Sequence, residues 1–506
     1  MRNQLKIGAL LSYVNIIANV VIGLVYTPVM LRLLGQAEYG LYSLIGSVMA
    51  YLSILDMGLG NTIVRYIAKN RATGDKKFEA ELNGLFLSIY SVIGVITVII
   101  GSILYLNIDN MFGATLSSDE LSKARIMMIM LIFNFAICFP LTVFASLIQA
   151  YERFIFLRVI NILRVVLNPI IALPFLLIGY GSIMLVTVTT ILNISALLMN
   201  VYYCFKYLDI HFARGKFEKA FLYEVAGYAF FIFLNAVMDK IYWGTGQFIL
   251  GMISGTIQVA VYAIAMQFMQ MYMMFSNAIS GVLLPKVTMM VANGANSRDL
   301  TNLMIKIGRL QYIIISYILV MFFLVGKEFI HLWAGENYLS AYPMILILMV
   351  GLLIALVQNA GISILQAMNL NRYRMTVYTI AAVINIFTSV ILAKMYGGLG
   401  CAISTAIALL ISTGLIMNRY YYKRIGIDIP LFWKNITHMM PSAFILIALV
   451  ELFQMNVSLE YSWLYFVIKV FVYSLIYAVL MYCLAMNGYE KNLCRSAICK
   501  VLRMNK

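Results

Sequence analysis

Long apolar runs separated by short polar connections extend along the whole 506-residue chain. About fourteen of these runs reach the ~20 residues that a helix needs to cross a bilayer. Each is expected to be helical, because a helix satisfies its own backbone hydrogen bonds in lipid. The predicted spans are 7–30, 39–62, 82–106, 124–148, 158–178, 182–204, 224–250, 255–283, 306–326, 342–366, 376–396, 399–417, 438–455 and 463–486. The pattern therefore predicts an all-α integral membrane protein.

Composition strengthens this prediction and removes several function classes. The chain is 63% hydrophobic and 11% charged, whereas soluble domains are about 25% charged. Its net charge of +16 does not indicate a nucleic-acid binder, because the basic residues lie in short connections and not on a folded polar domain. The six cysteines show no paired spacing, the three histidines are scattered, and no phosphate-binding loop is present. We expect no metal and no cofactor.

The distribution of basic residues predicts the orientation in the membrane. Most of the 36 Lys and Arg residues fall in alternate connections and in the two terminal segments. The positive-inside rule places this side, and hence both termini, in the cytoplasm. The outer connections are short, the longest being about 107–123, which argues against a large outer catalytic domain.

An internal repeat is indicated by residues that recur with the same spacing. Two sets match at an offset of 217 residues: Gln149, Asn168 and Gly181, then Gln366, Asn385 and Gly398. A further pair, Gly35 with Tyr42 and Gly255 with Tyr262, matches at an offset of 220. A repeat of six spans inserts both copies in the same orientation. We expect two six-helix bundles around a central cleft, plus two extra C-terminal helices.

The predicted organisation follows from these bundles. The expected parts are an N-terminal bundle at 1–205, a cytoplasmic linker at 206–223, a C-terminal bundle at 224–418, a cytoplasmic loop at 419–437, two additional spans at 438–487 and a basic cytoplasmic tail at 488–506.

Several short motifs then resemble one family. The matching stretches are Leu31 to Tyr42 (LRLLGQAEYGLY), Leu55 to Leu59 (LDMGL) with Arg65-Tyr66, Asp239-Lys240-Ile241 with Tyr262, and Leu365-Gln366-Ala367 with Arg372. They resemble motifs of the bacterial polysaccharide flippases, which export O-antigen and capsule repeat units. That family belongs to the superfamily that also contains multidrug extruders and peptidoglycan-precursor flippases. The resemblance covers the first twelve spans.

The resemblance implies a transporter and not an enzyme. Such a protein is expected to move an undecaprenyl-diphosphate-linked oligosaccharide from the cytoplasmic to the outer leaflet of the bacterial inner membrane. Alternating access coupled to a proton or sodium gradient is the implied mechanism. The implied partners are this lipid-linked glycan, membrane lipids, the coupling ion and other polysaccharide assembly proteins, with no nucleic acid.

A diphosphate crossing ~30 Å of hydrocarbon needs a wet, cationic cleft. The candidate residues for this cleft are Lys240, Arg164, Arg309 and Lys394. Lys240 lies about halfway along its span and either lines the cleft or forms a buried ion pair. The two arginines, about two turns into their spans, either bind the diphosphate or snorkel to headgroups. Lys394, near an outer span end, has the same two interpretations.

Carboxylates within spans are candidates for ion coupling. Asp239 either senses the gradient or neutralises a nearby basic residue. Asp56, close to Gly58, either binds an ion or ties two helices together. Glu451 and Lys469 lie in the two extra spans and are expected to pair structurally.

Two alternative functions remain open from sequence alone. A multidrug or cation antiporter of the same superfamily would need acidic residues to dominate the cleft. A membrane glycan polymerase would need catalytic residues on the outer side.

Overall fold

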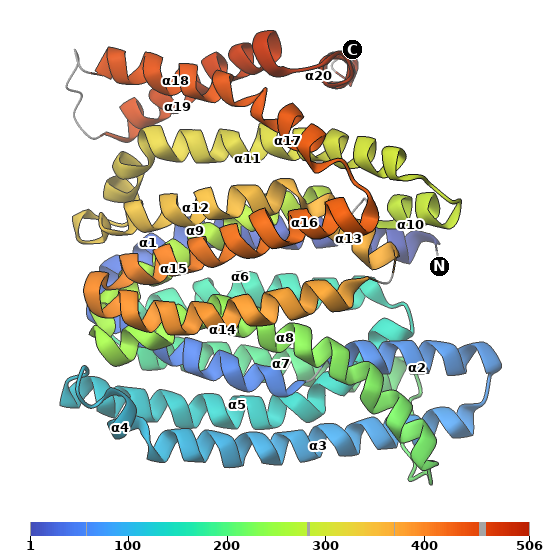
Figure 1. The fold of residues 1–506 in the computed structure, drawn as a ribbon. Helices are drawn as coiled ribbons and strands as arrows, with labels where there is room; N and C mark the ends of the chain where they lie inside the picture. The colour runs from blue at the N-terminus through green and yellow to red at the C-terminus, as the bar shows by residue number, and fades with distance from the viewer. Residues whose placement is uncertain (1, 57, 281–283, 369, 455–461, 505–506) are drawn as a thin grey trace. The chain divides into compact units, whose positions relative to one another are not determined.

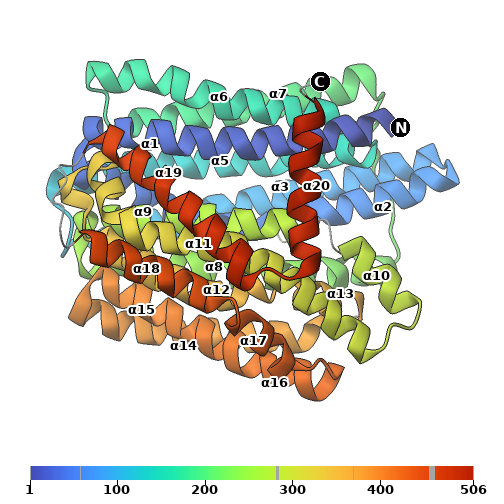
Figure 2. The same ribbon diagram turned by 90° about the horizontal axis from the view of Figure 1, so that it is seen from above.

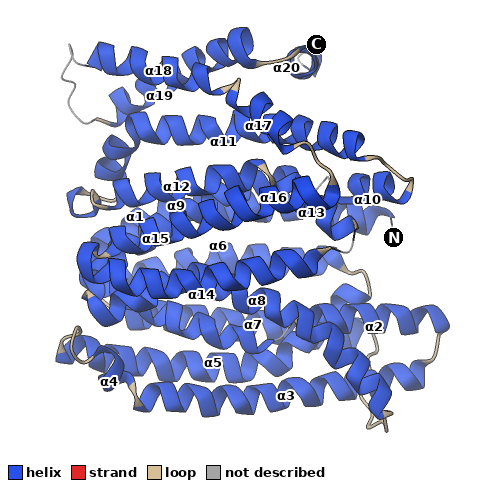
Figure 3. Ribbon diagram, viewed as in Figure 1, coloured by secondary structure: helices blue, strands red, loops and turns tan. Residues whose placement is uncertain are grey.

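The computed structural model describes residues 2–56, 58–280, 284–368, 370–454 and 462–504. Throughout these residues the chain forms helices and short connections, without a strand (Figure 3). This confirms the all-helical class predicted from the apolar runs. The chain divides into two compact units, Met1–Ala263 and Ile264–Lys506.

The first unit is built from long helices coloured blue to green in Figure 1. They are α1 (Arg2–Leu52), the 3-10 turn η1 (Ser53–Asp56), α2 (Leu59–Thr73), α3 (Lys76–Leu106), α4 (Ile108–Phe112), α5 (Ser118–Ala150), α6 (Phe154–Ile178), α7 (Ser182–Tyr207), α8 (Lys219–Ile253) and the start of α9 (Gly255–Ser280). Here α5 packs against α3 and α7, whereas α1 packs against α6 and α8. A core between α2, α3 and α5 contains fully buried aromatic side chains such as Phe86 and Tyr90.

Helix α1 is interrupted at Gly35, whose φ of 75° and ψ of 174° are not helical. A positive φ is a conformation that glycine adopts without a Cβ penalty. The 51 residues of α1 would measure about 77 Å if straight, more than twice the hydrocarbon thickness. The break at Gly35 therefore divides α1 into a first segment that is long enough to span a bilayer and a second segment, 36–52, of about 26 Å, which η1 extends.

The second unit contains the remaining helices. They are the end of α9, α10 (Leu284–Ala292), α11 (Ser297–Trp333), η2 (Glu336–Tyr338), α12 (Ala341–Val357), α13 (Asn359–Ala367), α14 (Asn371–Tyr396), α15 (Gly398–Leu409), the π-helical η3 (Leu410–Met417), α16 (Asn418–Tyr420), the π-helical η4 (Tyr421–Ile425), α17 (Ile429–Thr437), α18 (Met440–Gln454), α19 (Trp463–Leu480), the π-helical η5 (Met481–Ala485) and α20 (Gly488–Met504). Helix α11 packs against α12, α17, α18 and α19.

Helix α20 runs across the direction of α11 and α18, as Figures 1 and 2 both show. The tail predicted at 488–506 is therefore helical over Gly488–Met504. Its sequence places Lys491, Arg495 and Lys500 among apolar residues. A basic amphipathic helix lying across the spans has the geometry of a helix at the membrane interface.

The number of spans differs from the expected fourteen. Among the described residues, twelve helices are long and apolar enough to cross a membrane, and the bent pair α12–α13 raises this to thirteen. The first of these is a single 64-residue stretch, Leu10–Thr73, which contains both spans predicted at 7–30 and 39–62. The difference from fourteen thus lies in α1, where the continuous helix hides the break at Gly35. Residues 455–461, which connect the two predicted C-terminal spans, lie outside the described residues.

The boundary between the compact units lies beyond the predicted linker at 206–223. Helix α8, expected to open the second bundle, packs against α1, η1, α2 and α4 of the first unit. The contacts therefore place α8 in the first unit. The predicted boundary between the bundles is based on the internal sequence repeat, which these contacts do not test. That boundary remains a prediction.

Candidate functional site

Helix α8 is fixed to the first unit by polar contacts at two levels. Near its start, Tyr66 Oη of α2 donates to Glu224 Oε1 at 2.9 Å. Near its other end, the hydroxyls of Tyr51 and Thr245 are 2.9 Å apart. Between these two levels lies Lys240. The predicted candidate thus lies on a helix that is held to α2 and α1 by hydrogen bonds on either side of it.

The side chains of Asp239 and Lys240 are both exposed, although they lie in the middle of a span. Buried positions such as Tyr242 and Ile249 mark the packed face of α8. At 100° per residue, Lys240 points about 160° away from Tyr242. Lys240 has no ion-pair partner among the described residues. Of the two interpretations of Lys240, the structure thus does not show the buried ion pair among the described residues, and the cleft role stays a prediction.

Asp56 lies in η1 and accepts a hydrogen bond from Tyr90 Oη at 2.7 Å. Tyr90 itself is fully buried in α3. Gly58, which follows in the same motif, has a φ of 65°, and a Cβ there would lie 2.1 Å from Ile232 Cγ2 of α8. The glycine therefore allows α8 to approach the η1–α2 junction. The hydrogen bond between Tyr90 and Asp56 joins η1 to α3, which matches the interpretation that Asp56 ties two helices together.

Arg164 is half-buried in α6, and its Nη1 donates to Asn193 Oδ1 of α7 at 2.9 Å. It has no ion-pair partner among the described residues. A guanidinium carries five N–H donors in a planar fork. One hydrogen bond orients the side chain and leaves most of this capacity for an anion.

Lys394 is exposed in the last turn of α14. A cation there interacts favourably with the carbonyl end of the helix and with the interface. Its position thus matches the headgroup interpretation more closely than the cleft.

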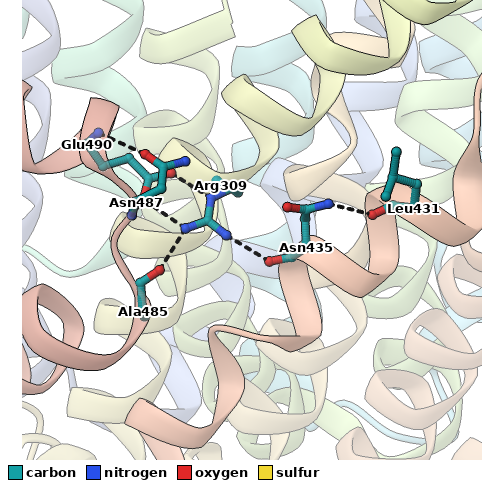
Figure 4. Close-up of polar contacts among 6 residues, drawn as sticks. All are labelled: Arg309, Leu431, Asn435, Ala485, Asn487 and Glu490. Atoms are coloured by element: carbon teal, nitrogen blue, oxygen red, sulfur yellow. Dashed lines mark hydrogen bonds and ion pairs between the residues drawn. The ribbon is translucent and has the colours of Figure 1, made fainter.

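Arg309 is the candidate that the structure removes from the cleft (Figure 4). Its side chain is 4% exposed, and its Nε and Nη2 donate to Glu490 Oε1 at 2.6 Å and Oε2 at 2.9 Å. Nη2 also donates to Ala485 O at 2.7 Å, and Nη1 donates to Asn435 O at 3.0 Å. All three nitrogens of the guanidinium are thus engaged by protein groups. Four of the five N–H groups of this buried guanidinium donate to protein oxygens, and Arg309 joins α11 to α17 and α20.

Lys469 pairs structurally, but not with the expected residue. Its Nζ lies 2.8 Å from Glu328 Oε2 of α11, and Glu328 is 6% exposed. Glu451 is instead close enough to Tyr342 for an electrostatic interaction. The predicted pairing of Glu451 with Lys469 is therefore wrong. The ion pair fixes α19 to α11.

The glycine-containing motif at 31–42 has a structural explanation. Glu38 Oε1 accepts from Ser182 N at 3.0 Å and from Ser182 Oγ at 3.2 Å, which caps the start of α7. A Cβ on Gly40 would lie 1.9 Å from Thr256 O in the first turn of α9. Thr256 Oγ1 in turn donates to Glu120 Oε1 at 2.7 Å. These residues join the part of α1 that follows its break to the starts of α5, α7 and α9, beside a cavity of about 580 Å³.

One hydrogen bond occurs at matching places in the two predicted copies. Asn168 Nδ2 of α6 donates to Thr189 Oγ1 of α7 at 3.0 Å. Asn385 Nδ2 of α14 donates to Thr405 Oγ1 of α15 at 3.4 Å. The two helical hairpins therefore use the same polar contact between their helices, which supports the predicted repeat.

Three residues that matter in these contacts were not identified from the sequence. Glu490 lies in the stretch interpreted as a basic tail, and Glu328 lies beside Lys327 at a predicted span end. Asn193 carries no charge and lies in an apolar run. An acid beside basic residues at a span end was the only signal for Glu490 and Glu328, and none marked Asn193.

The comparison with protein families decides the assignment. Residues 5–291, more than half of the chain, match the family described as "Polysaccharide biosynthesis protein". The chain belongs to this family. The resemblance to polysaccharide flippases predicted from the short motifs is thereby confirmed.

A relative of this polysaccharide biosynthesis protein is named "Putative O-antigen transporter" from Shigella flexneri. It is 20% identical over 404 residues, which cover 77% of this chain and 91% of the relative.

Solved structures show the same fold. "Lipid II flippase MurJ, inward closed conformation" has a TM-score of 0.71 at 14% identity, covering 94% of this chain and 98% of that one. An inward-facing multidrug resistance MATE family transporter of the MOP superfamily has a TM-score of 0.63 at 15% identity, covering 83% and 99%. This member of the polysaccharide biosynthesis family is thus a multi-pass membrane protein with the fold of MurJ and MATE transporters.

Proposed function

We propose that this protein is a flippase for an oligosaccharide linked to undecaprenyl diphosphate. It moves this lipid from the cytoplasmic to the outer leaflet of the bacterial inner membrane by alternating access. At the substrate site, Lys240 and Arg164 contact the diphosphate.

The single observation that carries the proposal is the exposed side chain of Lys240 in the middle of α8. Lys240 is 13 residues, or about 20 Å, from the end of α8 at Ile253. An ammonium at this depth in hydrocarbon is costly unless it meets water or an anion. A water-filled cleft that receives a diphosphate would satisfy this requirement.

Arg164 adds a second cationic group within a span. Its guanidinium is already oriented by Asn193, so less side-chain entropy is lost when an anion binds. Arginine binds phosphate oxygens with its planar fork, and lysine binds them as a point charge. Together the two groups would supply both modes of recognition.

Asp239, next to Lys240 and exposed, is our candidate for coupling to protons or sodium. Its carboxylate would exchange its ion when the cleft opens to either side. Asp56 is a weaker candidate, because its contact with Tyr90 already accounts for one carboxylate oxygen.

The relatives support transport over enzymatic activity. The curated relative is named as a transporter, and the solved structures with this fold are named as a flippase and as transporters. The antiporter alternative stays weaker, because the matching family model and the curated relative are named for polysaccharide biosynthesis and O-antigen transport. Drug-resistance profiles of a deletion strain would reveal it. Turnover of labelled precursor by the purified protein would reveal a polymerase.

The direct test is to delete the gene and to determine which leaflet accumulates the undecaprenyl-linked repeat unit. Accumulation in the cytoplasmic leaflet, with loss of surface glycan, is the expected result. Accumulation in the outer leaflet would place the protein after translocation and would overturn the proposal.

The residue test uses Lys240→Ala, which we expect to abolish most transport while leaving the protein in the membrane at its normal level. Lys240→Arg keeps the charge and should retain part of the activity. Lys219→Ala is the matched control, since Lys219 is an exposed lysine at the start of the same helix. Full activity in Lys240→Ala would remove this residue from the site.

A further inference from the structure

A separate polar pocket of about 350 Å³ lies within the first unit, at the ends of α2, α3 and α5. Its lining includes Arg71, Lys76, Asn83, Tyr151 and His211. Cavities that bind small ligands begin at about 300 Å³. The distribution of Lys and Arg predicts that this end of the spans is cytoplasmic.

A cationic group is held in place at this pocket. The guanidinium of Arg71 stacks on the Tyr151 ring, with Cζ 3.9 Å from the ring centroid. Its Nη1 also donates to Ala150 O at 2.9 Å. These two contacts orient the side chain and leave further N–H groups available. Lys76, the first residue of α3, is exposed and has no ion-pair partner among the described residues.

The same pocket contains a buried acceptor without a donor. Asn83 is 1% exposed, and its Nδ2 donates to His211 O at 3.1 Å. That bond defines which amide atom is the oxygen. Its Oδ1 has no hydrogen-bond partner among the described residues. Leaving a buried acceptor unpaired costs about 1–3 kcal/mol, and a ligand hydroxyl would remove this cost.

Backbone strain gathers at this pocket as well. In the described part of the chain, only two non-glycine residues have a positive φ, Glu152 at 58° and Asp209 at 49°. Asp209 lines the pocket, and Glu152 follows Tyr151 directly. Such strain persists where surrounding contacts enforce it and gathers at ligand sites. Tyr151 donates to Glu79, and burial, followed by this bond, raises the pKa of Tyr151, so it stays a donor.

We infer that this pocket binds a phosphate ester that also carries hydroxyl groups. Arg71 and Lys76 contact the phosphate, and Asn83 Oδ1 accepts from a hydroxyl. This chemistry has two sources at the membrane surface, the glycerol headgroup of an anionic phospholipid and a sugar phosphate. The site is independent of the proposed transport cleft, because it needs neither Lys240 nor Arg164.

The test uses the full-length protein in phosphatidylcholine nanodiscs. In one arm, glucose 1-phosphate is titrated and its binding is measured by calorimetry. In the other arm, the nanodiscs also contain phosphatidylglycerol, and retained lipid is counted by native mass spectrometry. Saturable binding in the first arm identifies a sugar phosphate, and selective retention in the second identifies a phospholipid headgroup.

Two variants and a control connect the binding to the pocket. Lys76→Gln should weaken the apparent Kd about tenfold, because one charge-assisted hydrogen bond is lost. Asn83→Leu should weaken it further if that variant folds. Lys77→Gln is the matched control, since Lys77 is the neighbouring exposed lysine and does not line the pocket. No binding in either arm, or equal loss in Lys76→Gln and Lys77→Gln, would overturn the inference.

Discussion

The hairpins α6–α7 and α14–α15 share one hydrogen bond and differ one turn away from it. Four residues before Asn168 and after Thr189 lie Arg164 and Asn193, which contact each other. The corresponding positions around Asn385 and Thr405 hold Ala381 and Leu409, which are 9% and 2% exposed.

This difference shows that a hairpin of this kind packs without an arginine at this position. The second copy forms the same Asn–Thr contact with small and apolar side chains in place of the polar pair. A charge within a span is costly. Its presence in one copy alone therefore points to a role other than packing.

The same contrast extends to other basic residues within spans. In the second unit, Arg309 and Lys469 each pair with a carboxylate, Glu490 and Glu328. In the first unit, Arg164 and Lys240 have no ion-pair partner among the described residues. The ion pairs of Arg309 and Lys469 thus join helices of the second unit, whereas no carboxylate among the described residues pairs with Arg164 or Lys240.

The largest effect on stability is expected when the buried ion pair between Arg309 and Glu490 is broken. Arg309→Met or Glu490→Leu should each destabilise the protein by about 3–5 kcal/mol, because the remaining partner stays buried without its counter-charge. The double variant should recover most of this loss, since an apolar pair replaces the ion pair. Thermal unfolding in detergent measures all three proteins. Native stability in either single variant would contradict the structural role of Arg309.

Replacing Arg164, which has no ion-pair partner among the described residues, should lower the transport rate and leave the stability of the protein little changed. Arg164→Ala should lower transport at least about tenfold, equivalent to about 1.4 kcal/mol, while unfolding is little changed. Arg164→Lys should be intermediate, because lysine lacks the planar fork. Arg158→Ala, near the start of the same helix, is the control, and transport rates in proteoliposomes provide the measurement. Loss of stability without a specific transport defect would return Arg164 to a packing role.

The smallest effect is expected at the Asn–Thr hydrogen bond that both hairpins share. Asn168→Ala should cost only about 0.6 kcal/mol, the average for a hydrogen bond between membrane helices. Asn385→Ala should cost more, about 1–2 kcal/mol, because Asn385 Oδ1 also accepts from Ser404 Oγ at 2.7 Å and Ser389 Oγ at 3.2 Å. Unfolding midpoints of the two variants compare them directly. Equal costs would mean that these extra bonds contribute nothing.

Much of the fold could be predicted from the sequence, because lipid imposes a strong constraint on length and polarity. Apolar runs of about 20 residues identified the spans, and short motifs identified the family. The number of spans differed at α1. The polar residues around Arg32 and Gln36 predict a connection between two spans, whereas the backbone there is helical except at Gly35.

The roles of individual charges could not be predicted in this way. Arg164 and Arg309 have the same position in the sequence pattern, about two turns into a span. What separates them is a carboxylate 181 residues beyond Arg309, brought close only by the folding of α20. Local patterns carry no information on such a contact. Lys469 shows the same limit, because its true partner lies on α11 and not on the neighbouring span.

The distance in sequence between Arg309 and Glu490 also has a consequence for biogenesis. At synthesis rates of about 5–20 residues per second, the ribosome needs on the order of ten seconds or more to add the 181 residues that separate them. During this interval α11 is already made, but its arginine lacks a counter-charge. A nascent chain that stops before Glu490 would therefore contain Arg309 without its carboxylate partner, and quality-control proteases could recognise such a chain.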